Sequence, residues 1–189
     1  SVSTYILVVS EEKRSYKASF KYLVLGSVAS AFFLFGVGIV YETTGVLNMD
    51  IISSMNMSQL KITFLLFLTS LGIKSGIFPL HLWIPDAHSI APPPVSALLS
   101  GLVLKIGIYS MLRLFYTVFK TNFSEMNDIL MAVGAITVIF GAVLALAQKD
   151  LRRMLASSCI LLNWLIILGC SFGTELGIIG ALYMILAHA

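Results

Sequence analysis

Long apolar runs separated by short charged clusters dominate the pattern of this 189-residue chain. Three uncharged runs of about 20 residues lie between Lys21 and Glu42, between Asp128 and Lys149, and between Arg153 and Glu175. A membrane-spanning helix needs about 20 predominantly apolar residues. The pattern therefore predicts one membrane crossing in each run. Two more runs of similar length each contain a single lysine near the middle.

The predicted fold class is all-α, a polytopic transmembrane helical bundle that forms a single transmembrane domain over residues 1–189. Helices are favoured because backbone groups in lipid must be satisfied within the segment, and no short alternating pattern indicates a barrel. The predicted spans are 1–9 (partial), 21–41, 62–85 (broken), 95–116, 128–148, 154–173 and 175–189 (partial). The absence of an initiator Met and the apolar stubs at both ends predict an internal fragment of a longer protein.

Composition agrees with a membrane protein and excludes other classes. Hydrophobic residues make up 58% of the chain and charged residues 11%, against roughly 45–50% and 25% in soluble domains. Basic residues gather in the segment 10–21 and again at 149–153. Because cytoplasmic loops carry an excess of Lys and Arg, we expect loop 10–21 to be cytoplasmic in a multi-pass protein of the cell membrane. No continuous basic face indicates nucleic-acid binding.

One lysine, Lys74, lies deep in its apolar run. A charged side chain at mid-membrane costs at least about 2.5 kcal/mol, so such residues usually face a polar interior and have a function there. Pro79 follows five residues later, lacks an N–H and clashes with the preceding turn. The sequence therefore predicts a discontinuous helix near Lys74 to Pro79, with the break just after the lysine.

The second lysine, Lys105, lies in the middle of the next apolar run. No acidic or second basic residue shares its helix face, so its partner is expected on another helix. If Lys74 and Lys105 share a cavity, they could exchange protons, which a proton relay requires. A static structural role, with each lysine bonded to carbonyl groups, is the alternative.

Two histidines and an aspartate lie between the two lysines. His81, His88 and Asp86 are candidate proton-uptake groups, because imidazole titrates near neutral pH. As metal ligands they are disfavoured, since their spacing across a proline fits no common site. The alternative is an ordinary interfacial segment in which Trp83 is a membrane anchor. His188, in the last apolar run, is either a packing histidine or a further relay residue.

No cofactor is expected for this chain. It has no cysteine cluster for an iron–sulfur centre, no paired histidines for haem and no glycine-rich phosphate loop. Redox or hydrolytic chemistry therefore cannot be assigned to it, and neither a cofactor-binding residue nor a metal ligand is predicted.

The run GIKSGIFPLHLWIPDAHSIAPPPVSALLSGLVLKIGIYSMLR resembles the core of the antiporter-like subunits of respiratory complex I, energy-converting hydrogenases and Mrp-type cation/proton antiporters. QKDLRRMLASSCI and the terminal LAHA also resemble this family. The resemblance implies inverted repeats with discontinuous helices. It also implies a proton relay through Lys74, Lys105 and His188, and a glutamate partner for Lys74 just before Ser1.

The resemblance implies a non-redox, proton-translocating subunit of an NADH:quinone oxidoreductase or of an energy-converting hydrogenase complex. Alternatively, the chain is part of an Mrp-type Na+/H+ antiporter subunit, with Na+ as a second transported ion. Its partners would be other membrane subunits, protons and the lipid bilayer. The segment SSCILLNWLIILG departs from the Ser-, Gly- and His-containing version of many relatives, so the link to the second half-channel at Asn163 stays open.

Overall fold

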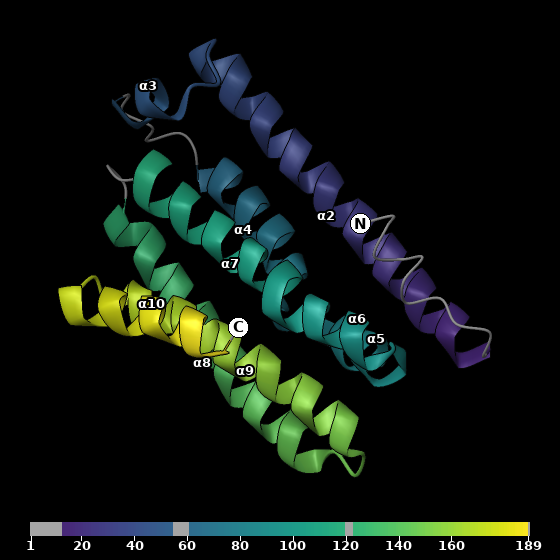
Figure 1. The fold of residues 1–189 in the computed structure, drawn as a ribbon. Coiled ribbons are helices and arrows are strands. Elements are labelled where there is room, and N and C mark those ends of the chain that lie inside the picture. Colours follow the sequence, from purple (N-terminus) through teal and green to yellow (C-terminus); the bar gives the residue numbers. More distant parts are fainter. Residues whose placement is uncertain (1–12, 55–60, 120–122, 189) are drawn as a thin grey trace.

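The computed structural model describes residues 13–54, 61–119 and 123–188 (Figure 1). The predicted partial span 1–9 lies outside these residues. In chain order the described elements are α2 (Lys13–Thr44), α3 (Met49–Ser54), α4 (Lys61–Ser75), the 3-10 turn η1 (Leu80–Leu82), α5 (Trp83–Ile90), α6 (Pro93–Leu98), the π-helical turn η2 (Leu99–Val103), α7 (Leu104–Arg113), the π-helical turn η3 (Leu114–Val118), α8 (Phe123–Ala147), α9 (Leu151–Ser171) and α10 (Glu175–His188).

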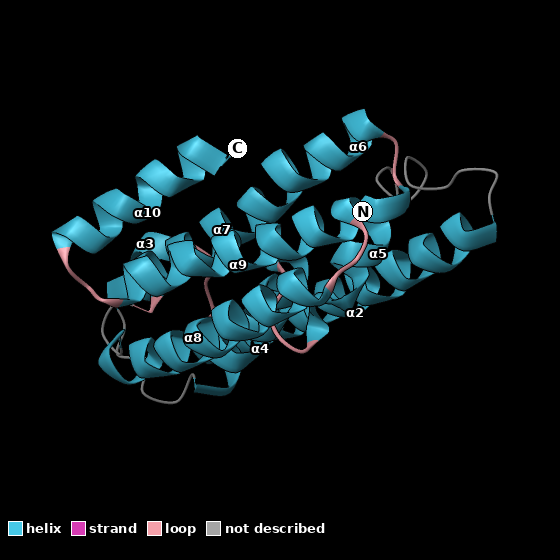
Figure 2. Cartoon of the chain, turned by 90° about the horizontal axis from the view of Figure 1, so that it is seen from below, coloured by secondary structure: helices cyan, strands magenta, loops and turns pink. Residues whose placement is uncertain are grey.

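Five helical segments within the described residues are long and apolar enough to cross a membrane. They are Tyr16–Thr44, Lys61–Ile90, Pro93–Val118, Asn127–Ala147 and Leu151–Ser171, and the shorter apolar helix α10 follows them. Figure 2 shows only helices and connecting loops over the described part of the chain. The prediction of an all-α transmembrane bundle is confirmed, and the protein is a multi-pass membrane protein.

The described part of the predicted loop 10–21 is helical instead, and so is the segment that joins the predicted spans 62–85 and 95–116. Residues 13–21 form the first turns of α2, while residues 10–12 lie outside the described residues. Residues 83–90 form α5, because Trp83, Ile84 and Ala87 bury one common face of a helix. Only a short connection around Pro92 separates α5 from α6.

The long helices run alongside one another in a layered bundle (Figure 1). α4 packs between α2 and α7, and α9 packs against α8, α10 and α5. The short helix α5 contacts both α2 and α9 and so joins the two sides of the bundle. Helix α10 crosses over α9 at an angle (Figure 1). This arrangement places α4, α7 and α9 at the centre. Lys74 lies on α4 and Lys105 on α7.

Aromatic packing and one buried hydrogen bond hold the central helices together. Phe64 of α4 lies against Phe115 and Phe119 at the end of the α7 segment, with ring centroids 4.5 Å and 5.8 Å away. Ser70 of α4 donates to the carbonyl of Ala29 in α2 at 2.6 Å, and both residues are fully buried. These contacts fix α4, and with it Lys74, against its neighbours.

Candidate functional site

The break in the second membrane segment begins at Gly76, two residues after Lys74. Helix α4 ends at Ser75, and helical structure resumes only at Leu80, the first residue of η1. Gly76 has a φ of +87°, in the left-handed region, and a Cβ there would overlap the Cδ1 of Ile84. A glycine is therefore required at this turn. The predicted discontinuity near Lys74 to Pro79 is confirmed.

Backbone groups released by the break are bonded within the protein. The N–H of Ile77 donates to the carbonyl of Gly72 at 2.7 Å. The indole N–H of Trp83 donates to the carbonyl of Ile73 at 2.8 Å. Trp83 is only 2% exposed, so its interpretation as an interfacial anchor is wrong. Its amphipathic ring lies inside because it supplies the donor that the interrupted α4 no longer provides.

Lys74 is half-buried and lines a cavity of about 240 Å³. The walls come from α2, α4, α5, η2 and α7, and the lining residues are Tyr22, Gly26, Leu71, Ile73, Lys74, Trp83, Val103, Ile106, Gly107 and Ser110. Gly107 allows close approach, because a Cβ there would lie 3.5 Å from the Cβ of Lys74. Lys74 is therefore packed against α7 at its base, with its side chain at a cavity wall.

Lys105 is more deeply buried, at 6% exposure, and is bonded to a different helix. Its Nζ donates to Oδ1 of Asn163 in α9 at 2.5 Å. Asn163 is fully buried. The partner thus comes from another helix, as the absence of a suitable group on its own helix face predicts. Asn163, in the segment that departs from the family's Ser-, Gly- and His-containing version, is thus in direct contact with Lys105.

Lys105 does not line the cavity of Lys74. The cavity of Lys74 is lined along α7 by Ile106 and Gly107, while Lys105 is not among its lining residues and bonds to α9. Because successive helical residues are about 100° apart, Lys105 and Gly107 face nearly opposite sides of α7. The Cβ of Lys74 and the side chain of Lys105 therefore lie on opposite sides of α7.

His188 lies near the end of α10, which packs against α9. It is half-buried, and its Nε2 is buried without a hydrogen-bond partner among the described residues. Lys105 is near enough for its charge to influence this imidazole. The structure therefore brings Lys105, Asn163 and His188 into one neighbourhood, on the opposite side of α7 from the cavity of Lys74.

His81, His88 and Asp86 have three different environments. His81 is buried beside the break and stacks on Phe78, with ring centroids 5.7 Å apart. Neither of its ring nitrogens has a partner among the described residues. Asp86 instead accepts bonds from Lys21 at 2.7 Å and Arg153 at 3.3 Å. This carboxylate joins the first half of α2 to the start of α9, so these segments lie at the same end of the bundle.

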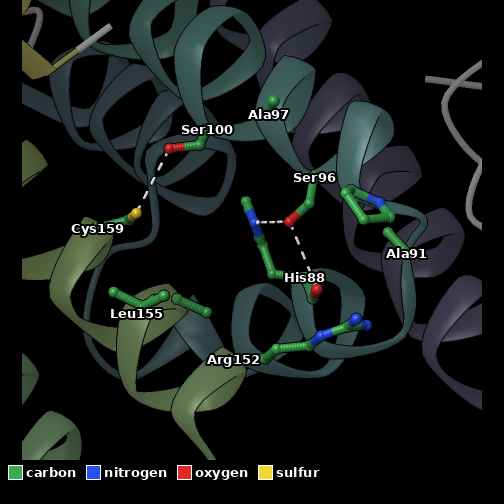
Figure 3. A pocket seen from close by; sticks show the side chains of 10 residues that line it. His88, Ala91, Ser96, Ala97, Ser100, Arg152, Leu155 and Cys159 are labelled. Atoms are coloured by element: carbon green, nitrogen blue, oxygen red, sulfur yellow. Dashed lines mark hydrogen bonds between the residues drawn. The ribbon is translucent and has the colours of Figure 1, made fainter.

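His88 lines a second cavity, of about 340 Å³, between α5, α6 and α9 (Figure 3). Its Nδ1 lies 2.9 Å from the Oγ of Ser96, and its Nε2 is buried without a partner among the described residues. Across the cavity, the Oγ of Ser100 and the Sγ of Cys159 are 3.4 Å apart. The guanidinium group of Arg152 lies at the edge (Figure 3). His88 therefore lines a different cavity from Lys74.

Within the described residues, no group of three or more His, Cys, Asp or Glu side chains is arranged to hold a metal ion. Cys159 and Cys170 are free thiols on α9. The sequence did not predict Asn163 as the partner of Lys105. Its signal was an isolated amide in an otherwise apolar run, which is costly in a membrane core unless the amide is bonded.

The comparisons with known proteins agree with this architecture. The family described as NADH:quinone oxidoreductase/Mrp antiporter, TM matches residues 1–189. NADH-quinone oxidoreductase subunit N of Desulforudis audaxviator is 37% identical over 100% of this chain and 39% of its own length. A Na(+)/H(+) antiporter subunit of Alkalihalophilus pseudofirmus is 32% identical over 99% of this chain and 39% of its own length. The chain thus spans about two fifths of each of these relatives.

Solved structures match the fold closely. A chain of the membrane-bound sulfane sulfur reductase, an archaeal respiratory membrane complex, has a TM-score of 0.91 and 35% identity over 99% of this chain and 40% of that chain. A chain of the Mrp complex from Dietzia sp. DQ12-45-1b has a TM-score of 0.91 and 26% identity over 98% of this chain and 36% of that chain. Together with the match along the full sequence, these findings show that the chain belongs to the NADH:quinone oxidoreductase/Mrp antiporter transmembrane family.

Proposed function

We propose that this chain is the core of a proton-translocating, antiporter-like subunit of a membrane complex. Lys74, Lys105 and His188 change protonation in turn and carry the proton through the interior of the bundle. The observation that carries the proposal is the burial of Lys105, at 6% exposure, with a neutral amide as its partner. A buried amine that no carboxylate of the described residues holds is able to release its proton.

The helix break supports a role for Lys74. An interrupted helix at membrane depth is tolerated where its backbone groups are bonded within the protein or line a cavity. Both conditions apply here, through the bond from Trp83 and the cavity beside Lys74. Discontinuous helices of this kind form the ion sites of many transporters. Transfer between Lys74 and Lys105 then requires water or side chains that connect the two sides of α7.

Proton uptake is assigned to His81 and His88, near Asp86 at the end of the bundle that also holds Lys21 and Arg153. His88 faces a cavity, and His81 is next to the break, which supports these two histidines as uptake groups. Asp86 is bonded to two cations, so its contribution is to hold α5 in place. The excess of basic residues supports a cytoplasmic location for this end.

Two kinds of complex remain candidates for the assembled protein. Relatives include a subunit of NADH-quinone oxidoreductase and a subunit of a Na(+)/H(+) antiporter, and both match nearly the whole chain. In the first kind, this subunit would move protons driven by redox partners. In the second, it would exchange protons against Na+. In either case its partners are other membrane subunits and the lipid bilayer.

Replacement of Lys74 in the full-length subunit, within its assembled complex, tests the relay. We expect Lys74→Ala to abolish proton translocation into sealed vesicles while the complex still assembles. Lys74→Arg should also abolish it, because arginine keeps the charge and the hydrogen bonds but does not release its proton. The control is Lys149→Ala, since Lys149 is exposed in the loop between α8 and α9.

The arginine variant separates the relay from a purely structural scaffold. In a scaffold, lysine serves only as a static donor to carbonyl groups, so Lys74→Arg would retain translocation. Unchanged translocation in both variants would sink the proposed relay. The same vesicles, prepared with and without a Na+ gradient, distinguish the two kinds of complex: Na+-driven proton movement without an electron donor identifies the antiporter.

A further inference from the structure

The bond between Lys105 and Asn163 joins two fully internal side chains from different helices. Nζ of Lys105 in α7 donates to Oδ1 of Asn163 in α9 at 2.5 Å, and the exposures are 6% and 0%. An ammonium group only donates, so the amide must present its oxygen. The opposite orientation would direct the amide hydrogens at the ammonium. The lysine therefore fixes which way the Asn163 amide points.

The chemical class of this partner matters for proton transfer. An amide oxygen stabilises an ammonium by a hydrogen bond but neither takes up nor releases a proton at physiological pH. A carboxylate at the same place would form a buried ion pair, in which each charge strongly opposes loss of the other. No carboxylate of the described residues pairs with Lys105. The site thus provides an anchor for the charged lysine without a proton acceptor.

Other titratable groups approach Lys105 from each neighbouring helix. Cys159 lies on α9 and is within electrostatic reach of Lys105. His188, on α10, is also within its reach. Lys74 of α4 lies across α7, against Gly107. Of these groups, His188 is the one neutral nitrogen base, so we take it as the acceptor for a proton that leaves Lys105.

The amide nitrogen of Asn163 can form a further hydrogen bond. Its Nδ2 is buried and has no acceptor among the described residues. A buried donor of this kind is unfavourable unless it meets an acceptor. An imidazole nitrogen or a water molecule provides one. The same side chain can therefore hold Lys105 through its oxygen while its N–H groups remain available to a further acceptor.

We propose that Asn163 is a positioning residue that holds the charged form of Lys105 in place through a proton-inert amide, so that the proton leaves Lys105 toward the His188 side rather than to its anchor. This inference rests on the proposed relay and specifies how one step of it is controlled. The residue acts through Lys105 and does not itself carry the proton.

Two substitutions of similar size test the proposal in the full-length, assembled complex. In Asn163→Leu, the alkaline half-point of proton translocation should move to lower pH by about one unit, because the ammonium loses its acceptor. In Asn163→Asp, the ion pair should move the same half-point to higher pH and lower the rate at neutral pH at least about tenfold. Opposite shifts would not result from a general packing defect.

Asn127 offers a matched control, because it is a partly buried amide on α8 that donates to the carbonyl of Ser171. Asn127→Leu and Asn127→Asp should leave the half-point unchanged, even if they lower the yield of the complex. The proposal is overturned if both Asn163 variants keep the wild-type half-point or shift it in the same direction. If Asn163→Leu fails to assemble, the direction of the shift in Asn163→Asp decides alone.

Failure of the proposed role of Asn163 can be distinguished from failure of the proton relay itself. If Lys74→Arg and Lys105→Leu leave translocation unchanged, the proposed function is wrong. If both abolish translocation but the Asn163 variants retain the wild-type pH profile, the relay stands and only the role of Asn163 is wrong.

Discussion

Replacing Gly76 with alanine tests whether the break beside Lys74 depends on a left-handed backbone. Gly76 has a φ of +87°, and a Cβ there would overlap Cδ1 of Ile84, which is fully buried. A left-handed conformation costs a non-glycine residue about 1–2 kcal/mol. Extra volume in a packed core adds about 1–3 kcal/mol. Gly76→Ala should therefore destabilise the protein by about 2–5 kcal/mol.

The assay is thermal unfolding of the detergent-solubilised full-length subunit, followed by its helical circular dichroism signal. We expect the midpoint to fall by several degrees. Gly38→Ala is the matched control, because a Cβ at Gly38 in α2 meets no atom within 4 Å. It should leave the midpoint nearly unchanged.

A double variant separates the two contributions. Ile84→Val removes the Cδ1 atom that the new Cβ would overlap. In the Gly76→Ala/Ile84→Val protein, the destabilisation caused by steric overlap should be relieved, whereas the destabilisation caused by the left-handed backbone should remain. A double-mutant cycle measures the two contributions. A wild-type midpoint for Gly76→Ala would refute the reasoning, as would an equal loss in Gly38→Ala.

Two further predictions concern contacts around the break. Trp83→Phe keeps an aromatic ring but removes the donor to the carbonyl of Ile73. Because a buried acceptor is left unpaired, the protein should lose about 1–3 kcal/mol of stability, measured as a lower unfolding midpoint. An unchanged midpoint would show that this hydrogen bond does not stabilise the protein. Asp86→Asn removes the carboxylate that pairs with Lys21 and Arg153. Because these side chains are 26–46% exposed, the loss of stability should stay near or below about 1 kcal/mol per pair and become smaller at high salt. A large loss of stability that does not depend on salt would contradict this expectation.

Much of the fold could be predicted from local properties of the chain. The bilayer sets the length of an apolar helix, so runs of about 20 residues predict helices without any knowledge of their neighbours. The break beside Lys74 was also predictable, because a proline has no N–H and cannot continue a helix. The sequence also predicted that Lys105 needs a hydrogen-bonding partner, because it lies in the middle of an apolar run. The helical start of α2, by contrast, was missed, since charged residues do not by themselves end a helix.

Only the tertiary structure decided which groups meet. Asn163 lies 58 residues from Lys105 in sequence, and their bond depends on how α7 and α9 are oriented against each other. The same packing places Lys74 and Lys105 on opposite sides of α7 and brings Trp83 inside to the carbonyl of Ile73. Hydropathy sets how deep a residue lies in the membrane, whereas the rotation of each helix about its axis, which depends on the whole packed interface, sets what that residue faces.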